Sequence, residues 1–129
     1  MMPVLVDTCG WIEWLTDGEL ADCFAPYLGT PAEVLVPAVI QFEIYKWVKR
    51  ERDEIMALEV VALTEQCQVI PLDTSTALLA ADLSLAHRLS FADALIYATA
   101  QQHHATLVTA DDHFAALPQV TFHRKSRSR

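Results

Sequence analysis

Residues 90–100 read SFADALIYATA, an alanine-rich segment that carries one acid, Asp93, among apolar side chains. The pattern predicts a helix that begins at Ser90, because a serine followed three residues later by an acid is typical of a capping box. A carboxylate in the first turn also complements the helix dipole. Taken alone, Asp93 therefore has an ordinary structural explanation. Whether Asp93 also has a functional role depends on where the other acids of the chain lie.

Three other acids stand close to short apolar runs. Asp7 ends the first run, Asp111 follows the run 105–110, and Glu43 lies early in the helix expected after the run 34–37. If these runs are parallel strands, right-handed crossovers bring their carboxyl ends to one edge of the sheet, where α/β domains bind ligands. The sequence therefore predicts that the four carboxylates gather at that edge.

Short apolar runs alternate with helical segments along the whole chain. The expected strands are residues 3–6, 34–36, 69–72, 106–108 and, at the sheet edge, 120–122. The expected helices are residues 8–15, 20–28, 39–52, 55–67, 77–88 and the segment 90–100, with a short helix or turn at 111–117. Such alternation is typical of a parallel sheet with helices on both faces. We expect a three-layer α/β/α domain with a central, mostly parallel sheet of four to five strands.

Length and composition suit one compact domain. The chain has 129 residues, 53% of them hydrophobic, and a mean hydropathy of +0.23, which excludes a disordered protein. We expect a domain over residues 1–123 and a basic tail over residues 124–129. No apolar run approaches the ~20 residues of a membrane span, and no basic region precedes the apolar start, so a cytoplasmic location is expected. The three cysteines show neither a disulfide framework nor a thiolate zinc spacing.

Four like charges at one edge repel one another and need compensation. Asp7 and Asp111 can each be explained as helix N-caps, but Glu43 lies among apolar neighbours and needs a partner or a cation. A divalent ion resolves the conflict, and carboxylate oxygens favour Mg²⁺ or Mn²⁺ over zinc. The histidines show no metal-binding spacing and are not expected among the ligands; they are His87, His103, His104, His113 and His123.

The basic residues are clustered, although the net charge of −8 argues against a broad non-specific nucleic-acid binder. Of nine Lys and Arg residues, four lie in the tail, four lie in residues 46–52, and Arg88 stands alone. Lys46 and Arg50 follow Glu43 by three and seven residues, so on a helix they share its face and can reach phosphates beside the acids. The other interpretation is a solvated helix face.

Four segments together resemble the PIN domain family, and more narrowly the VapC-like toxin ribonucleases of bacterial and archaeal toxin–antitoxin pairs. These segments are Val4–Thr8, Gln41–Glu43, Ser90–Ala94 and Leu107–Asp111. Each motif is weak alone, but their order and spacing extend over nearly the whole chain. The domain over residues 1–123 is then expected to be a PIN-like nuclease domain.

The resemblance implies a quartet of acids that is both catalytic and metal-binding. In this sequence the quartet falls on Asp7, Glu43, Asp93 and Asp111, with a supporting hydroxyl on Thr109. The family often has a second acid two residues after the fourth, where this chain has His113. Asp112 therefore remains an alternative to Asp111 as the fourth acid.

The activity implied by the resemblance is metal-dependent hydrolysis of RNA by an endoribonuclease. One or two Mg²⁺ or Mn²⁺ ions held by the quartet would activate water for in-line attack and neutralise the scissile phosphate. The expected products carry a 5′-phosphate and a 3′-hydroxyl. The expected targets are tRNA, rRNA or mRNA, whose cleavage inhibits translation. Lys46, Arg50 and Arg88 are the expected RNA-binding residues, with a weaker contact from the tail.

Two alternatives lack enzymatic activity. A receiver-like regulatory domain also gathers acids around Mg²⁺, but it needs a lysine after a late strand, and none of the nine basic residues stands there. A catalytically silent PIN-like domain that only binds a partner would lack one of the acids, and none is missing.

Aromatic residues on two expected helices suggest a protein interface; they are Trp11, Trp14, Tyr45 and Trp47. Trp and Tyr are enriched in interfaces, and part of this set is equally expected in the core. In VapC-like proteins the C-terminal segment of the antitoxin lies over these helices and places a basic residue in the acid cluster. The resemblance therefore implies a VapB-like antitoxin as a partner, and a homodimer.

Overall fold

The computed structural model of the protein describes residues 2–126. Its five-stranded sheet has the order β3-β2-β1-β4-β5, and every pair of neighbouring strands is parallel. The strands are β1 (Val4–Val6), β2 (Val34–Pro37), β3 (Gln68–Ile70), β4 (Thr106–Thr109) and β5 (Val120–Phe122). The expected α/β/α fold class is confirmed, and the fifth strand does lie at the sheet edge.

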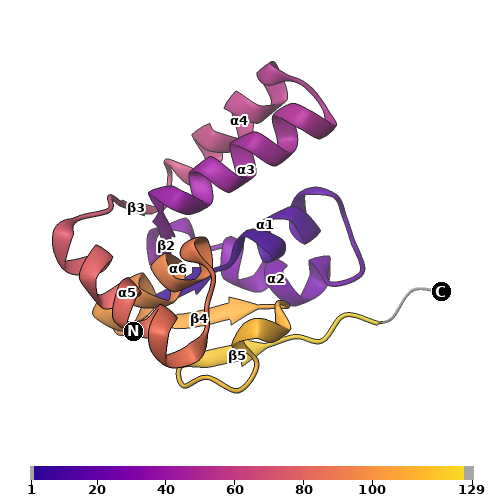
Figure 1. Ribbon diagram of the computed structural model, residues 1–129. Helices are drawn as coiled ribbons and strands as arrows, with labels where there is room; N and C mark the ends of the chain where they lie inside the picture. Colours follow the sequence, from indigo (N-terminus) through magenta and orange to yellow (C-terminus); the bar gives the residue numbers. More distant parts are fainter. Residues whose placement is uncertain (1, 127–129) are drawn as a thin grey trace.

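Two α-helices follow each of the first three strands before the next strand begins (Figure 1). The α-helices are α1 (Thr8–Leu15), α2 (Ala21–Leu28), α3 (Ala38–Glu51), α4 (Glu54–Thr64), α5 (Thr74–His87) and α6 (Phe91–Gln102), and the 3-10 helices are η1 (Pro31–Glu33) and η2 (Asp112–Phe114). The chain runs from β1 to β3 through α1 to α4, then returns past β1 to β4 through α5 and α6. Right-handed crossovers place these two groups of helices on opposite faces. Within residues 2–126, no helix has the length and apolar character to cross a membrane.

The helix α6 is buried along most of its length. Residues 94–100 are all buried, and the fully buried Tyr97 donates a 2.9 Å hydrogen bond to the carbonyl of Pro118. The side chain of Ser90 accepts the backbone N–H of Asp93, as the capping pattern predicts. Because α6 begins near the carboxyl edge of the sheet, its first turn presents Asp93 beside the ends of β1 and β4, where the order of strands reverses.

Several boundaries differ from the sequence prediction, and three of these differences have a local cause. The strand expected to reach residue 72 ends at Ile70, because Pro71 cannot donate to the ladder. The helix expected over 55–67 ends at Thr64, whose hydroxyl donates to the carbonyl of Val61. The helix expected from residue 77 begins at Thr74, because the Asp73 side chain caps it.

The first residues of the expected basic tail fold back onto the domain. Lys125 Nζ lies 2.7 Å from Glu13 Oε2 on α1, and the backbone N–H of Ser126 donates to Glu19. Arg127 and Arg129, which were also expected in the tail, lie outside the described residues.

Candidate functional site

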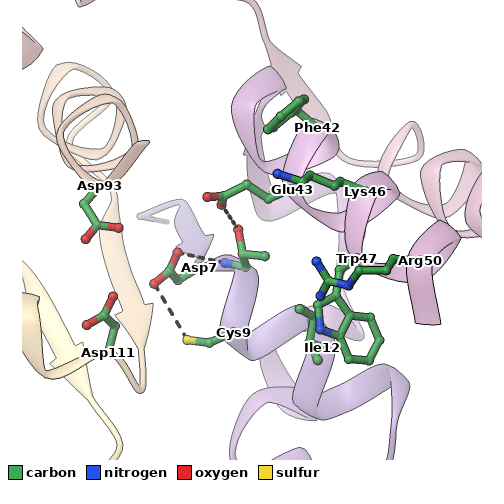
Figure 2. A pocket seen from close by; sticks show the side chains of 11 residues that line it. Asp7, Cys9, Ile12, Phe42, Glu43, Lys46, Trp47, Arg50, Asp93 and Asp111 are labelled. Carbon is green, nitrogen blue, oxygen red and sulfur yellow. Dashed lines mark hydrogen bonds between the residues drawn. The ribbon is translucent and has the colours of Figure 1, made fainter. Parts of the chain in front are cut away.

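A pocket of about 310 Å³ opens at the carboxyl edge of the sheet, between α6, the start of α1 and the middle of α3 (Figure 2). All four acids of the expected quartet line it. In Figure 2 the carboxylates of Asp93 and Asp111 face those of Asp7 and Glu43. The lining residues are Asp7, Thr8, Cys9, Ile12, Phe42, Glu43, Lys46, Trp47, Arg50, Asp93 and Asp111.

Asp7 is the most enclosed acid of the pocket, with 4% of its surface exposed. It caps α1, and its Oδ1 accepts the backbone N–H of Thr8 at 2.8 Å. Its Oδ2 accepts the hydroxyl of Thr109 at 2.8 Å. Burial raises the pKa of Asp7 to about 6, although these two hydrogen bonds lower it, and the nearby charges of Asp93 and Asp111 raise it further. A nearby cation would favour the ionised carboxylate.

Glu43 reaches the same pocket from the sixth residue of α3. The hydroxyl of Thr8 donates a hydrogen bond to its Oε1, which connects the helix α3 to the end of β1. Burial raises the pKa of Glu43, and the charges of Asp93 and Asp111 act in the same direction. Thr8 therefore positions one acid through its side chain and another through its backbone, a role that the sequence did not reveal.

The third and fourth acids line the pocket and contact His113, which does not line it. Asp111 accepts the backbone N–H of His113 at 2.9 Å, and this turn brings the imidazole Nδ1 to 3.3 Å from Asp111 Oδ1 and 3.4 Å from Asp93 Oδ2. Burial, followed by the charge of Asp111, raises the pKa of Asp93. The charge of Asp111, followed by the hydrogen bond with Asp93, raises the pKa of His113.

One histidine, His113, lies beside the acid cluster, although the spacing of the histidines gives no metal-binding signal. Ligand atoms of Asp93, Asp111 and His113 all lie within 4.8 Å of one another. The signal in the sequence is the spacing of two residues between Asp111 and His113, which a tight turn closes. Spacing between the histidines themselves carries no such signal.

Thr109 contacts both Asp7 and the backbone of Asp111. Asp112, by contrast, does not line the pocket. The Thr109 hydroxyl donates to Asp7 and accepts the backbone N–H of Asp111 at 2.9 Å. Asp112 is exposed and lies at a neighbouring pocket that Arg124 and Lys125 also line. The geometry thus places Asp111 among the other acids, and Asp112 outside them.

Cys9 lines the pocket next to Asp7 and Thr109. Its Sγ lies 3.5 Å from Thr109 Oγ1 and 3.7 Å from Asp7 Oδ2, and it accepts the backbone N–H of Ala110. Burial, followed by the charge of Asp7, raises the pKa of the thiol to about 12. Cys9 is therefore a neutral thiol at physiological pH. The three cysteines are all free, as their number and spacing suggest.

Two of the three expected RNA-binding residues line the pocket. Lys46 and Arg50 lie on the face of α3 that also carries Glu43, and both side chains are exposed. Arg88 is not among the lining residues; it ends α5 in a left-handed conformation, with φ of 57°.

One expected interface residue is in the core. Trp11 is 2% exposed and packs edge-to-face against Trp14 with 6.0 Å between ring centroids, so the expectation that it contacts a partner is wrong for the isolated chain. The reason is that the apolar face of α1 is directed inward. Trp14, Tyr45 and Trp47 are half-buried against the core, and Trp47 also lines the acidic pocket.

The donor set of the pocket fits Mg²⁺ or Mn²⁺. Hard carboxylate oxygens predominate, and within residues 2–126 none of the four acids forms a salt bridge with lysine or arginine. Burial, and to a smaller extent the neighbouring carboxylates, raises the pKa values of Asp7, Glu43 and Asp93, so their ionised forms need a compensating charge. A divalent cation would supply it.

Comparison with known proteins gives a consistent relationship. The sequence matches the PIN domain family over residues 4–120. A toxin–antitoxin complex from Klebsiella pneumoniae contains a chain with 24% identity and a TM-score of 0.76, and the alignment covers 92% of this chain and 95% of that chain. No curated protein sequence matches significantly.

Two further solved structures share the fold at lower identity. VapBC2 from Rickettsia felis, bound to a DNA fragment from its promoter, is 13% identical with a TM-score of 0.73, over 95% of this chain and 98% of that chain. VapC20 from Mycobacterium tuberculosis, a sarcin–ricin loop cleaving toxin, is 17% identical with a TM-score of 0.72, over 89% of this chain and 95% of that chain. At these identities the similarity establishes the fold.

Proposed function

Because this chain belongs to the PIN domain family, we propose that it is a Mg²⁺- or Mn²⁺-dependent endoribonuclease and the toxin of a VapC-like toxin–antitoxin pair. The observation that carries the proposal is the convergence of four acids on one pocket; they are Asp7, Glu43, Asp93 and Asp111. The acids come from separate parts of the chain, and Asp7 is buried where it is costly to ionise without a cation. Gathered and partly buried carboxylates destabilise the fold unless a cation neutralises them, so the arrangement is explained better by ion binding than by stability.

Each residue of the pocket has a separate task in this proposal. Asp7, Glu43, Asp93 and Asp111 would hold the ion or ions. Thr109 and Thr8 fix the carboxylates of Asp7 and Glu43 through hydrogen bonds, so that the oxygens need little reorganisation when an ion binds. When bound, Mg²⁺ or Mn²⁺ supplies positive charge that acidifies water and neutralises the scissile phosphate. Water is then the nucleophile, and the products carry a 5′-phosphate and a 3′-hydroxyl.

The RNA backbone is held beside the acids by cations on α3. Lys46 and Arg50 line the pocket and are free to approach phosphates, since Arg50 makes only an exposed ion pair with the adjacent Glu51. Arg88 and the described tail residues Arg124 and Lys125 do not line the pocket and would make weaker contacts. The proposed targets are tRNA, rRNA or mRNA in the cytoplasm.

A VapB-like antitoxin is the proposed protein partner. The toxin–antitoxin complexes among the related structures support this assignment. Trp14 and Tyr45, which are half-buried on α1 and α3, are the proposed contacts for the antitoxin. We also propose a homodimer, for which the apolar groove of about 300 Å³ between α5 and α6 offers a surface, since Phe91 on its rim is 76% exposed.

The experiment that tests the activity is cleavage of structured RNA by the purified chain without antitoxin. Cleavage should require Mg²⁺ or Mn²⁺ and stop in excess chelator. Asp7→Asn and Glu43→Gln should each lower the rate at least about 100-fold, because metal stabilisation of the transition state is worth several kcal/mol. Asp112→Asn is the matched control, since it removes the same charge beside the pocket.

Two results would contradict the proposal. Cleavage that continues in chelator would indicate a contaminating nuclease or a different mechanism. Equal loss of activity in Asp112→Asn and Asp7→Asn, with both variants folded, would mean that the enclosed quartet is not the reacting centre.

A further inference from the structure

The imidazole of His113 lies where a metal ligand would lie. Its Nδ1 is 3.3 Å from Asp111 Oδ1 and 3.4 Å from Asp93 Oδ2, so it lies at nearly equal distances from two carboxylates of different elements. Neighbouring ligand atoms around an ion with bonds of ~2.1 Å are about 3.0 Å apart in an octahedron and about 3.4 Å apart in a tetrahedron. The two distances from Nδ1 therefore match those between ligands of a shared ion, and the ligand atoms of Asp93, Asp111 and His113 all lie within 4.8 Å of one another.

The backbone holds His113 in this position independently of its side chain. The N–H of His113 donates to Asp111 Oδ1, and η2 folds the following residues back so that Phe114 is fully buried. The ring itself is exposed, with 70% of the side-chain surface accessible. An exposed ring can turn toward an ion without disturbing the core.

We propose that the His113 imidazole is a nitrogen ligand of the divalent ion held by Asp93 and Asp111, and that it gives this protein a preference for Mn²⁺ over Mg²⁺. The inference rests on the proposed function in one respect, namely that the acid cluster is a metal site. Imidazole nitrogen binds first-row transition ions well, whereas Mg²⁺ prefers oxygen ligands and keeps several waters. A site built only of carboxylates would discriminate less between the two ions.

The test is electron spin-echo spectroscopy of Mn²⁺ bound to the full chain, which detects ¹⁴N coupled directly to the ion. The wild type should show imidazole ¹⁴N modulation, and His113→Gln should lose it while retaining Mn²⁺. His104→Asn is the matched control and should keep the modulation; His104 lies in an exposed left-handed turn after α6 that asparagine also tolerates. Circular dichroism confirms that the variants are folded.

A second measurement compares affinities. In His113→Gln the ratio of the Mg²⁺ and Mn²⁺ dissociation constants should fall about tenfold, with most of the change on Mn²⁺. Wild-type protein that binds Mn²⁺ without ¹⁴N modulation would overturn the role of His113 and leave the carboxylate site intact. Wild-type protein that binds no Mn²⁺ would overturn both this inference and the proposed metal-dependent activity.

Discussion

The hydroxyl of Thr109 donates a 2.8 Å hydrogen bond to Asp7, which lies 102 positions earlier in the sequence. The same oxygen accepts the backbone N–H of Asp111 at 2.9 Å. One side chain at the end of β4 thus fixes an acid at the end of β1 and the backbone of another acid after β4. Because the strands β1 and β4 are adjacent, this contact links the Asp7 carboxylate to the backbone of Asp111 across the sheet edge.

Replacing Thr109 by valine should weaken both the metal site and the fold. The variant leaves Asp7 without its donor and the N–H of Asp111 without its acceptor, so we expect Mn²⁺ affinity to fall about 10- to 100-fold. The free energy of unfolding without metal should fall by about 1–3 kcal/mol, because buried polar groups lose their partners. Calorimetric titration and urea unfolding measure the two effects. Thr109→Ser, which keeps the hydroxyl, should recover most of the affinity; failure of this rescue would mean that the methyl group, not the hydrogen bond, matters.

Removing Lys46 and Arg50 together should weaken RNA binding and leave the metal site intact. The Michaelis constant should rise, and the slope of log affinity against log salt should fall by about 1.4 units for single-stranded RNA, because two phosphate contacts are lost. The control is Lys49→Ala with Arg52→Ala, which removes the same charge from the end of α3 and from its C-cap, outside the pocket lining. If both double variants show the same salt slope, the cluster is an ordinary solvated helix face and the RNA is held elsewhere.

Metal-free protein should lose stability as the pH rises from 5 to 7. Folding raises the pKa of Asp7 from 3.8 to about 6, so at pH 5 the folded state still holds a proton that the unfolded chain has already lost, and it gives up this proton as the pH rises to 7. The free energy of unfolding should therefore fall by about 1 kcal/mol from Asp7 alone, and the raised pKa values of Glu43 and Asp93 act in the same direction.

Urea unfolding in chelator measures this pH dependence, at low protein concentration because the isoelectric point is near 4.9. Asp7→Asn should be more stable than the wild type at pH 7 and should show a smaller pH dependence. A wild-type free energy of unfolding that rises between pH 5 and 7 would contradict the raised pKa of the buried acids.

The parallel sheet and its acidic edge were predictable because local pattern and topology agree. Most strands are short apolar runs, and Asp7 stands directly after β1 and Asp111 two residues after β4. The direction of the strands alone therefore brings these acids together. Glu43 was predictable for a different reason, since an acid among apolar helical neighbours needs a partner.

Other features depend on geometry that a linear pattern does not contain. His113 joins the cluster only because the side chain of Asp111 accepts its N–H and closes a tight turn. Trp11 and Trp14 stand on the same predicted helical face, yet only the contacts of α1 with its neighbours show that Trp11 is the one fully enclosed. Residues 65–67 were predicted to be helical, but α4 ends at Thr64 and these residues form the turn that leads into β3.

The central proposal is that the four carboxylates act as one site for a divalent cation, and the thermal midpoint with added Mn²⁺ tests it most directly. Saturating Mn²⁺ at about 100 times its dissociation constant should stabilise the wild type by about 2.7 kcal/mol, or roughly 5–10 °C, through binding to the folded state. Asp93→Asn and Asp111→Asn should lose most of this shift at matched ionic strength, and the exposed Asp112→Asn should retain it. Equal shifts in the wild type and in all three variants would contradict a cation site at the edge of the sheet.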